Sequence, residues 1–205
     1  SCHWDTRPWS DMEQNRQDKN QPIIGANDGA SGVAVLLELA RVMAENPPSI
    51  GVNLVMFDGE DMGIPGENET YCQGSRFFAK NLPIPKPYEA INLDMVGDKQ
   101  LHLPIEKYSL EFHPELVRYL WKRADKMGLD AFDMNPQYAI YDDHVPLHNI
   151  AGIPAIDLID FKYPNPYANF WHTMDDVPEN CSEESLNQVG RLMIDYIYNR
   201  ENQNW

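Results

Sequence analysis

Residues 52–61 read VNLVMFDGED. The first six are mostly apolar and partly β-branched, which is typical of a short buried strand. The dipeptide Asp58-Gly59 favours a turn and ends the strand. Two further acidic residues, Glu60 and Asp61, follow at once. The stretch therefore predicts a strand whose carboxyl end carries a group of carboxylates.

Strands and helices alternate along the rest of the chain. Apolar runs predict strands over residues 90–96 and 153–159, and helical spacing of apolar residues predicts helices over residues 33–43, 114–128 and 182–197. Residues 7–21 are polar and predict a loop. The buried faces of the three helices are expected to be formed by Val33, Leu36, Leu37, Ala40 and Met43; by Leu116, Val117, Leu120 and Trp121; and by Leu186, Val189, Leu192, Met193, Tyr196 and Ile197. Such alternation indicates an α/β domain with a largely parallel sheet, whose ligands bind outside the carboxyl ends of the strands.

Composition excludes several classes of function. With 205 residues and 42% hydrophobic content, the chain is long enough for one domain with a core. A net charge of -16 disfavours nucleic acid and anionic lipid as partners. No apolar run approaches the roughly 18 residues that span a bilayer. The three cysteines are too few and too scattered for a disulfide framework or a thiolate zinc site: Cys2, Cys72 and Cys181.

The chain opens on Ser1-Cys2-His3-Trp4-Asp5, a segment that looks functional although no apolar strand precedes it. We therefore expect residues 1–205 to form a single catalytic domain that is truncated at its N-terminus.

Acidic residues and a histidine fall at the predicted strand ends. Asp28 precedes the first helix, Asp61 and Asp94 lie at the ends of two strands, and His172 lies beyond a third. Several carboxylates buried together need a cation, and oxygen and nitrogen ligands without thiolates suit a catalytic Zn²⁺ with an open position. Each residue also has a structural interpretation: Asp28 as a helix N-cap, Glu60 and Asp61 as a solvated loop after the Asp58-Gly59 turn, and His172 as a structural residue.

Five motifs in order resemble metallopeptidase family twenty-eight: GANDGASGVAVLLELARVM, FDGED, NLDMVGD, DDHVPL and FWHTMDD. That family holds zinc aminopeptidases and the animal-type glutaminyl-peptide cyclotransferases, and the resemblance extends over about residues 1–199. It implies the zinc exopeptidase fold, a three-layer sandwich with a mixed, mostly parallel twisted sheet flanked by helices.

The resemblance also implies roles for individual residues. Asp28 would be a metal ligand able to bridge two ions, Asp61 and His172 would complete the site, and Glu60 would be the general acid/base. Asp61 departs from the Glu that is more usual at its position, so the metal or the backbone must come closer there. In the aminopeptidases, His3 and Asp94 would hold a second zinc, and Asp5 would orient the imidazole of His3.

Two features favour the cyclase branch of the family. Trp171 directly precedes the ligand histidine and would wall the pocket for an N-terminal glutamine. Asp142, the first residue of DDH, would join Glu60 and Asp94 in a carboxylate network. The expected reaction converts N-terminal glutamine to pyroglutamate with release of ammonia. A zinc aminopeptidase is the alternative, and a catalytically silent peptide- or metal-binding relative is a second one, against which the intact Glu60 argues.

The expected cofactor is Zn²⁺, with one ion favoured and two possible. The expected partners are peptide or protein N-termini, and the oligomeric state stays open. Family tendency alone suggests an extracytoplasmic location, periplasmic or secreted.

Overall fold

A computed structural model describes residues 1–200 of the chain. Its central strands form three parallel pairs, β1 with β2, β3 with β6 and β4 with β5. Their bounds are β1 (Cys2–His3), β2 (Met56–Phe57), β3 (Ala90–Asp94), β4 (Leu103–Ile105), β5 (Phe132–Pro136) and β6 (Ala155–Ile159). Ser1 extends β1 onto β3, because its amino group donates to the carbonyl of Ile91 and its own carbonyl accepts from Leu93. With β4 beside β6, the strands lie in the order β2-β1-β3-β6-β4-β5.

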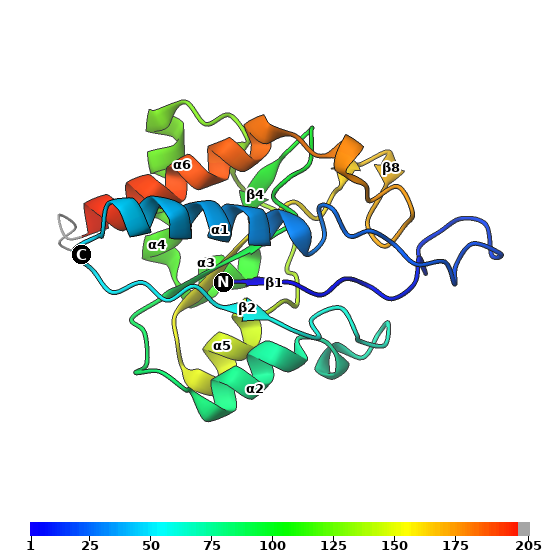
Figure 1. The fold of residues 1–205 in the computed structure, drawn as a ribbon, viewed down its shortest axis with the longest axis horizontal. Coiled ribbons are helices and arrows are strands. Elements are labelled where there is room, and N and C mark those ends of the chain that lie inside the picture. Colours follow the sequence, from blue (N-terminus) through cyan, green and yellow to red (C-terminus); the bar gives the residue numbers. More distant parts are fainter. Residues whose placement is uncertain (201–205) are drawn as a thin grey trace.

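Helices cover both faces of this sheet (Figure 1). Three of them share the larger core on one face: α1 (Ala30–Glu45), α4 (Pro114–Met127) and α6 (Glu183–Asn199). On the other face, α2 (Gln73–Asn81) packs against α5 (His144–Ala151). The short α3 (Lys107–Phe112) contacts β6. The predicted α/β class, with a mostly parallel sheet between layers of helices, is confirmed.

Antiparallel pairing within residues 1–200 is confined to the hairpin of β7 (Pro164–Asn165) with β8 (Ala168–Asn169) and to two isolated bridges. The hairpin and the long loop of residues 7–24 extend from the same end of the molecule, beyond the carboxyl ends of the strands (Figure 1). Among residues 1–200, no helix is both long and apolar enough to cross a membrane.

The last two predicted helices are confirmed, together with the predicted start and end of α4 and the predicted start of α6. Pro114 occupies the first turn of α4, and Gly128 ends the helix with φ 69°, a conformation that glycine adopts without strain. The Ser182 side chain accepts a hydrogen bond from the N–H of Ser185 and so caps α6. The apolar residues predicted for both helices lie in the main core cluster or pack against it.

Two sequence predictions were wrong in detail. Residues 52–57 form a strand only at Met56–Phe57, because the opposite strand β1 is itself only two residues long. The buried stripe of α1 contains Val35, Leu36 and Leu39, whereas Leu37 is 58% exposed. The first helix is apolar on more than one side, so its periodicity does not define the face that packs on the sheet.

Candidate zinc centre

The loop that carries Asp28 is held in place by the backbone of Asp5 and by the side chain of Asp176. Gly25 and Gly29 have φ values of 68° and 95°, and a Cβ on Gly29 would lie 2.4 Å from the backbone oxygen of Asp5. The carboxylate of Asp176 accepts the N–H groups of Asn27 and Asp28 at 2.8 and 3.1 Å. The N-cap position of α1 is Gly29, without a side-chain cap. The N-cap interpretation of Asp28 is therefore wrong.

Asp28, Asp61 and His172 converge at one point. His172 Nε2 lies 2.9 Å from Asp61 Oδ1 and 3.4 Å from Asp28 Oδ2, and all three side chains are buried. One donor atom from each residue lies within 4.8 Å of the other two. The interpretation of Glu60 and Asp61 as a solvated loop is also wrong, since their exposed fractions are only 8% and 3%.

A second group of donors shares Asp28 with the first. His3 Nε2 lies 3.2 Å from Asp28 Oδ1 and 3.0 Å from Asp94 Oδ1, so Asp28 lies between two imidazoles. On the other side of the ring, His3 Nδ1 is 3.6 Å from Asp5 Oδ1. This is the placement expected of a carboxylate that can bridge two ions and of an aspartate that orients a ligand imidazole.

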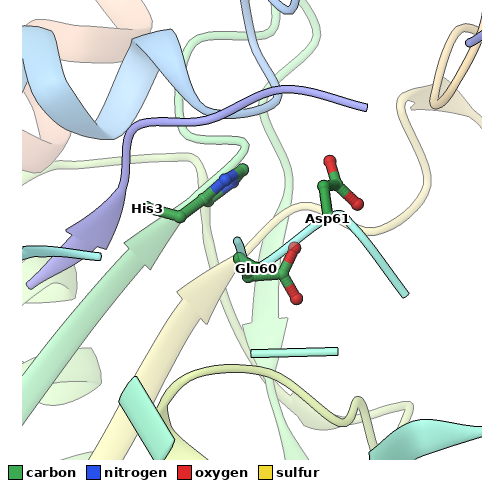
Figure 2. Close-up of side chains that lie close together, drawn as sticks. All are labelled: His3, Glu60 and Asp61. Atoms are coloured by element: carbon green, nitrogen blue, oxygen red, sulfur yellow. The ribbon is translucent and has the colours of Figure 1, made fainter. Parts of the chain in front are cut away.

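Glu60 lies beside His3 and Asp61, with donor atoms of all three within 4.8 Å of one another, and has two further neighbours (Figure 2). Its Oε1 accepts a hydrogen bond from Cys72 Sγ at 3.3 Å. One oxygen of the buried Asp142 lies within 4.8 Å of donor atoms of both residues. The amide Nδ2 of Asn92 donates to Asp142 Oδ2 at 3.1 Å and so holds that carboxylate in place. Glu60 and Asp142 thus form a buried carboxylate pair beside the metal donors.

The electrostatics follow from burying many carboxylates together. Burial, and next the charge of Asp61, raise the pKa of Asp28 to about 8. Burial raises the pKa of Asp94 to about 6, although His3 opposes the change. Burial, then Asp61 and Asp142, raise the pKa of Glu60 well above its usual range. A cation bound beside these carboxylates would favour their ionised forms.

The residues at the first donor group fit a zinc ion. Asp28 Oδ2 and Asp61 Oδ2 are buried and have no hydrogen-bond partner among residues 1–200, which is costly unless a cation binds them. Two carboxylates and one imidazole are the ligand types of catalytic zinc sites, which keep a further position open for substrate or water. We therefore regard Asp28, Asp61 and His172 as the residues that would hold the metal.

Backbone strain gathers at the same place. Among residues 1–200 the positive φ values outside glycine are those of Cys72, Met95 and His172, at 56°, 47° and 55°. The first contacts Glu60, the second follows Asp94, and the third is the donor histidine itself. Strained residues of this kind cluster at functional sites, where the surrounding structure holds them.

Trp171 lies directly against this centre. Its ring stacks on the imidazole of His172 with centroids 3.9 Å apart and an interplanar angle of 28°. The ring of Phe161 also packs against the indole of Trp171, with the two centroids 5.1 Å apart. The indole is half-buried, so part of it stays available to a ligand.

Sequence reasoning missed several residues that contact the centre. Arg7 and Asp11 belong to a polar stretch interpreted only as a loop, and Cys72 was considered only for disulfide and thiolate chemistry. Asn92, which holds Asp142, lies in a predicted strand. A buried asparagine within an apolar strand is a signal that could have been noticed, because its amide needs partners.

Residues 1–197 match the sequence profile described as Peptidase family M28. The chain belongs to this family. The predicted family resemblance is therefore confirmed, and it covers nearly all of the described residues.

Solved structures and a curated relative agree with the M28 assignment. A glutaminyl cyclase of Bacteroides thetaiotaomicron bound to N-acetylhistamine is 36% identical with a TM-score of 0.91, over 97% of this chain and 71% of that one. A Zn-dependent exopeptidase of Parabacteroides distasonis is 35% identical with a TM-score of 0.91, over 97% and 72%. Aminopeptidase YwaD of Bacillus subtilis is 28% identical over 97% of this chain. The chain spans 40% of the length of that relative and 60% of the length of the glutaminyl-peptide cyclotransferase of Bothrops jararaca.

Proposed function

We propose that this chain carries the active site of a zinc-dependent glutaminyl-peptide cyclotransferase, which converts an N-terminal glutamine to pyroglutamate and releases ammonia. The observation that carries the proposal is the buried pair of Glu60 and Asp142 beside the metal donors, together with the indole of Trp171 stacked on the donor histidine. The likeness to a solved glutaminyl cyclase at 36% identity supports it.

The reaction requires one proton to move within the site. The α-amine of the peptide attacks the side-chain γ-carbonyl carbon, the bond to the amide nitrogen breaks, and a proton passes from the attacking amine to the departing ammonia. Glu60 is suited to carry this proton, because burial and the neighbouring carboxylates Asp61 and Asp142 raise its pKa above its usual range and so favour its protonated form. Asp142 and Asp94 would adjust how firmly Glu60 holds it.

One zinc ion at Asp28, Asp61 and His172 would polarise the γ-carbonyl when it is bound. The remaining work belongs to the side chains. Trp171 would wall the pocket and exclude water from the glutamine side chain, which favours attack by the internal amine over hydrolysis. His3 would stay hydrogen-bonded to Asp94 rather than serve as a metal ligand.

A zinc aminopeptidase is the second candidate, and a specific observation favours it. His3, Asp28 and Asp94 form a further group of buried donor atoms within 4.8 Å of one another. A second zinc there would anchor the free amine of a peptide while Glu60 removes a proton from the water that attacks the first peptide bond. A Zn-dependent exopeptidase and an aminopeptidase are among the similar proteins.

Product analysis distinguishes these candidates. The protein would be incubated with a glutaminyl dipeptide and, separately, with a leucyl dipeptide, and the products weighed by mass spectrometry. Loss of ammonia with an intact peptide bond is the result expected for a cyclase. Release of a free amino acid would overturn that proposal in favour of the aminopeptidase, and turnover of neither substrate by the zinc-loaded protein would favour the silent relative.

Metal content provides an independent measurement. One tightly bound zinc per chain is expected for the cyclase, whereas two would support the aminopeptidase. An extracytoplasmic location stays a prediction that rests on the family resemblance.

A further inference from the structure

The side chain of Arg7 is buried, although it begins a polar loop. It is 1% exposed, and its Nη1 donates to the backbone oxygens of Asp61 and Gly63 at 2.6 and 2.7 Å. Its Nη2 and Nε donate to the two carboxylate oxygens of Asp11 at 2.7 and 3.4 Å. A buried guanidinium is tolerated only when its donors are paired, so these bonds fix the loop against the segment that carries Asp61.

Asp11 also reaches the donor histidine. Its Oδ1 lies 3.4 Å from Nδ1 of His172, whose other ring nitrogen faces Asp61. The next residue, Met12, donates its backbone N–H to the carbonyl oxygen of His172 at 3.2 Å. The loop therefore contacts this histidine through both its ring and its backbone.

The arrangement repeats one already present at His3. There Asp5 faces Nδ1 of the imidazole, and the same carboxylate accepts the N–H groups of Glu60 and Asp61 at 3.1 and 3.2 Å. In both cases the carboxylate of one aspartate lies close to Nδ1 of an imidazole, at 3.6 Å for Asp5 and 3.4 Å for Asp11. Each aspartate is also connected by hydrogen bonds to the segment that carries Glu60 and Asp61. Asp5 accepts hydrogen bonds from this segment directly, whereas Asp11 is connected to it through the side chain of Arg7.

We propose that Asp11 and Arg7 are positioning residues of the metal centre. When Nε2 of His172 binds the metal, Nδ1 carries the ring proton and donates it to Asp11, which fixes the tautomer and the direction of the ring. Arg7 holds Asp11 and the backbone of Asp61 together, so the two ligands keep one relative position. This inference rests on the proposed zinc site.

A different interpretation assigns the pair a purely structural part, in which it only keeps the loop folded. The two interpretations differ in what an Asp11 variant changes. A positioning residue affects metal affinity and ligand field in a protein that is still folded, whereas a loop clamp affects stability alone. Loss of a carboxylate behind a ligand histidine lowers metal affinity by roughly 10- to 100-fold.

The test compares Asp11→Asn with Asp18→Asn, a matched change in the same loop at a carboxylate that has no hydrogen bond or ion pair within residues 1–200. Zinc affinity would be measured by competition with a chromophoric chelator, and the visible spectrum would be recorded with Co²⁺ in place of zinc. Asp11→Asn should weaken zinc binding roughly 10- to 100-fold and shift the Co²⁺ bands. Asp18→Asn should stay within about twofold of the parent.

Equal zinc affinity and an unchanged Co²⁺ spectrum in Asp11→Asn would overturn the proposal. Arg7→Lys is a second variant that keeps the charge but loses the planar fork, and it should weaken zinc binding in the same direction. If that variant does not fold, Asp11→Asn decides alone, since Asp11 is partly exposed. Failure of the parent protein to bind zinc would instead remove the proposed zinc site itself.

Discussion

Both proposed reactions assign the proton transfer to the Glu60 side chain. Replacement by Gln keeps its size and leaves Asp28, Asp61 and His172 untouched, but the amide cannot accept and return a proton. We expect Glu60→Gln to lower kcat by about 10²- to 10⁴-fold, the usual contribution of a general acid/base, with zinc content unchanged. Steady-state kinetics and metal analysis on the same preparation would check this.

The control for this change is Glu69→Gln, an exposed carboxylate nearby in the chain. Its turnover should match the parent. If Glu60→Gln keeps its turnover, Glu60 has no part in proton transfer, and if it loses zinc, the residue belongs to the ligand set instead.

At this scale the sequence predicted the placement of most site residues, because ligands follow strands in a fixed pattern. Asp28, Asp61, His172, His3 and Asp94 all converge in the structure. Arg7 and Asp11 could not be predicted in the same way. Their partners are backbone oxygens and a ring nitrogen more than 50 residues away, and only the folded chain brings these together.

Gly29 decides how the element α1 begins and where Asp28 points. Its φ of 95° is one that side chains rarely adopt, and a Cβ would meet the Asp5 carbonyl at 2.4 Å. We expect Gly29→Ala to lower the free energy of unfolding by about 1–3 kcal/mol and to weaken zinc binding, since the displaced loop carries Asp28. Urea unfolding of the metal-free protein would give the first quantity, and chelator competition the second.

Gly190 provides the contrasting change within a helix. It lies inside α6, where a Cβ would meet no heavy atom within 4 Å apart from the adjacent backbone of the helix itself. Gly190→Ala should therefore stabilise the protein by about 0.5–1 kcal/mol and leave zinc affinity unchanged. A stabilising Gly29→Ala would show that the loop relaxes without strain and would contradict the role given to Gly29.

Elements were predictable where one periodic face or one clear end signal was present. The helix α6 shows both, with Ser182 at its start and one apolar stripe along it. The strand at residues 52–57 was predicted too long, because its length depends on the partner opposite it rather than on its own composition. The helices α2 and α5 were not predicted, since residues 73–81 and 144–151 are short segments next to polar motifs.

The stability of the whole molecule should depend on zinc. A ligand that binds only the folded state stabilises it by RT ln(1 + [L]/Kd), about 4 kcal/mol at a thousandfold excess over Kd. For a chain of this size that corresponds to roughly 10 °C in Tm. We expect the Tm in excess zinc to be higher than the Tm in chelator by about this amount. The Asp28→Asn variant should lose most of this difference in Tm. Identical unfolding in zinc and chelator would contradict the buried metal site.

A separate pH dependence should arise at Glu89, which lies just before β3 and contacts the start of α4 and the end of α6. Its carboxylate accepts hydrogen bonds from Tyr196 and Arg200 at the end of α6 and lies 3.1 Å from His113 at the start of α4. Burial alone would raise its pKa, but the bonds from His113, Arg200 and Tyr196 outweigh it and lower the pKa to about 2. The folded state therefore prefers the ionised carboxylate more strongly than the unfolded state does.

The sign of the effect follows from linkage. A pKa lowered on folding gives stability that is present above the unfolded pKa, near 4.3, and is lost as the pH falls toward about 2. Because Glu89 is partly exposed, solvent screening reduces its contribution, and Glu89→Gln should cost about 1–2 kcal/mol at pH 7. That difference should shrink steadily between about pH 4.3 and the lowest pH at which the protein stays folded. Urea unfolding of the parent and of Glu89→Gln at several pH values would measure this difference in stability, with the exposed Glu179→Gln as the control. A difference as large at pH 3 as at pH 7 would mean that the ionised carboxylate does not hold α4 and α6 together.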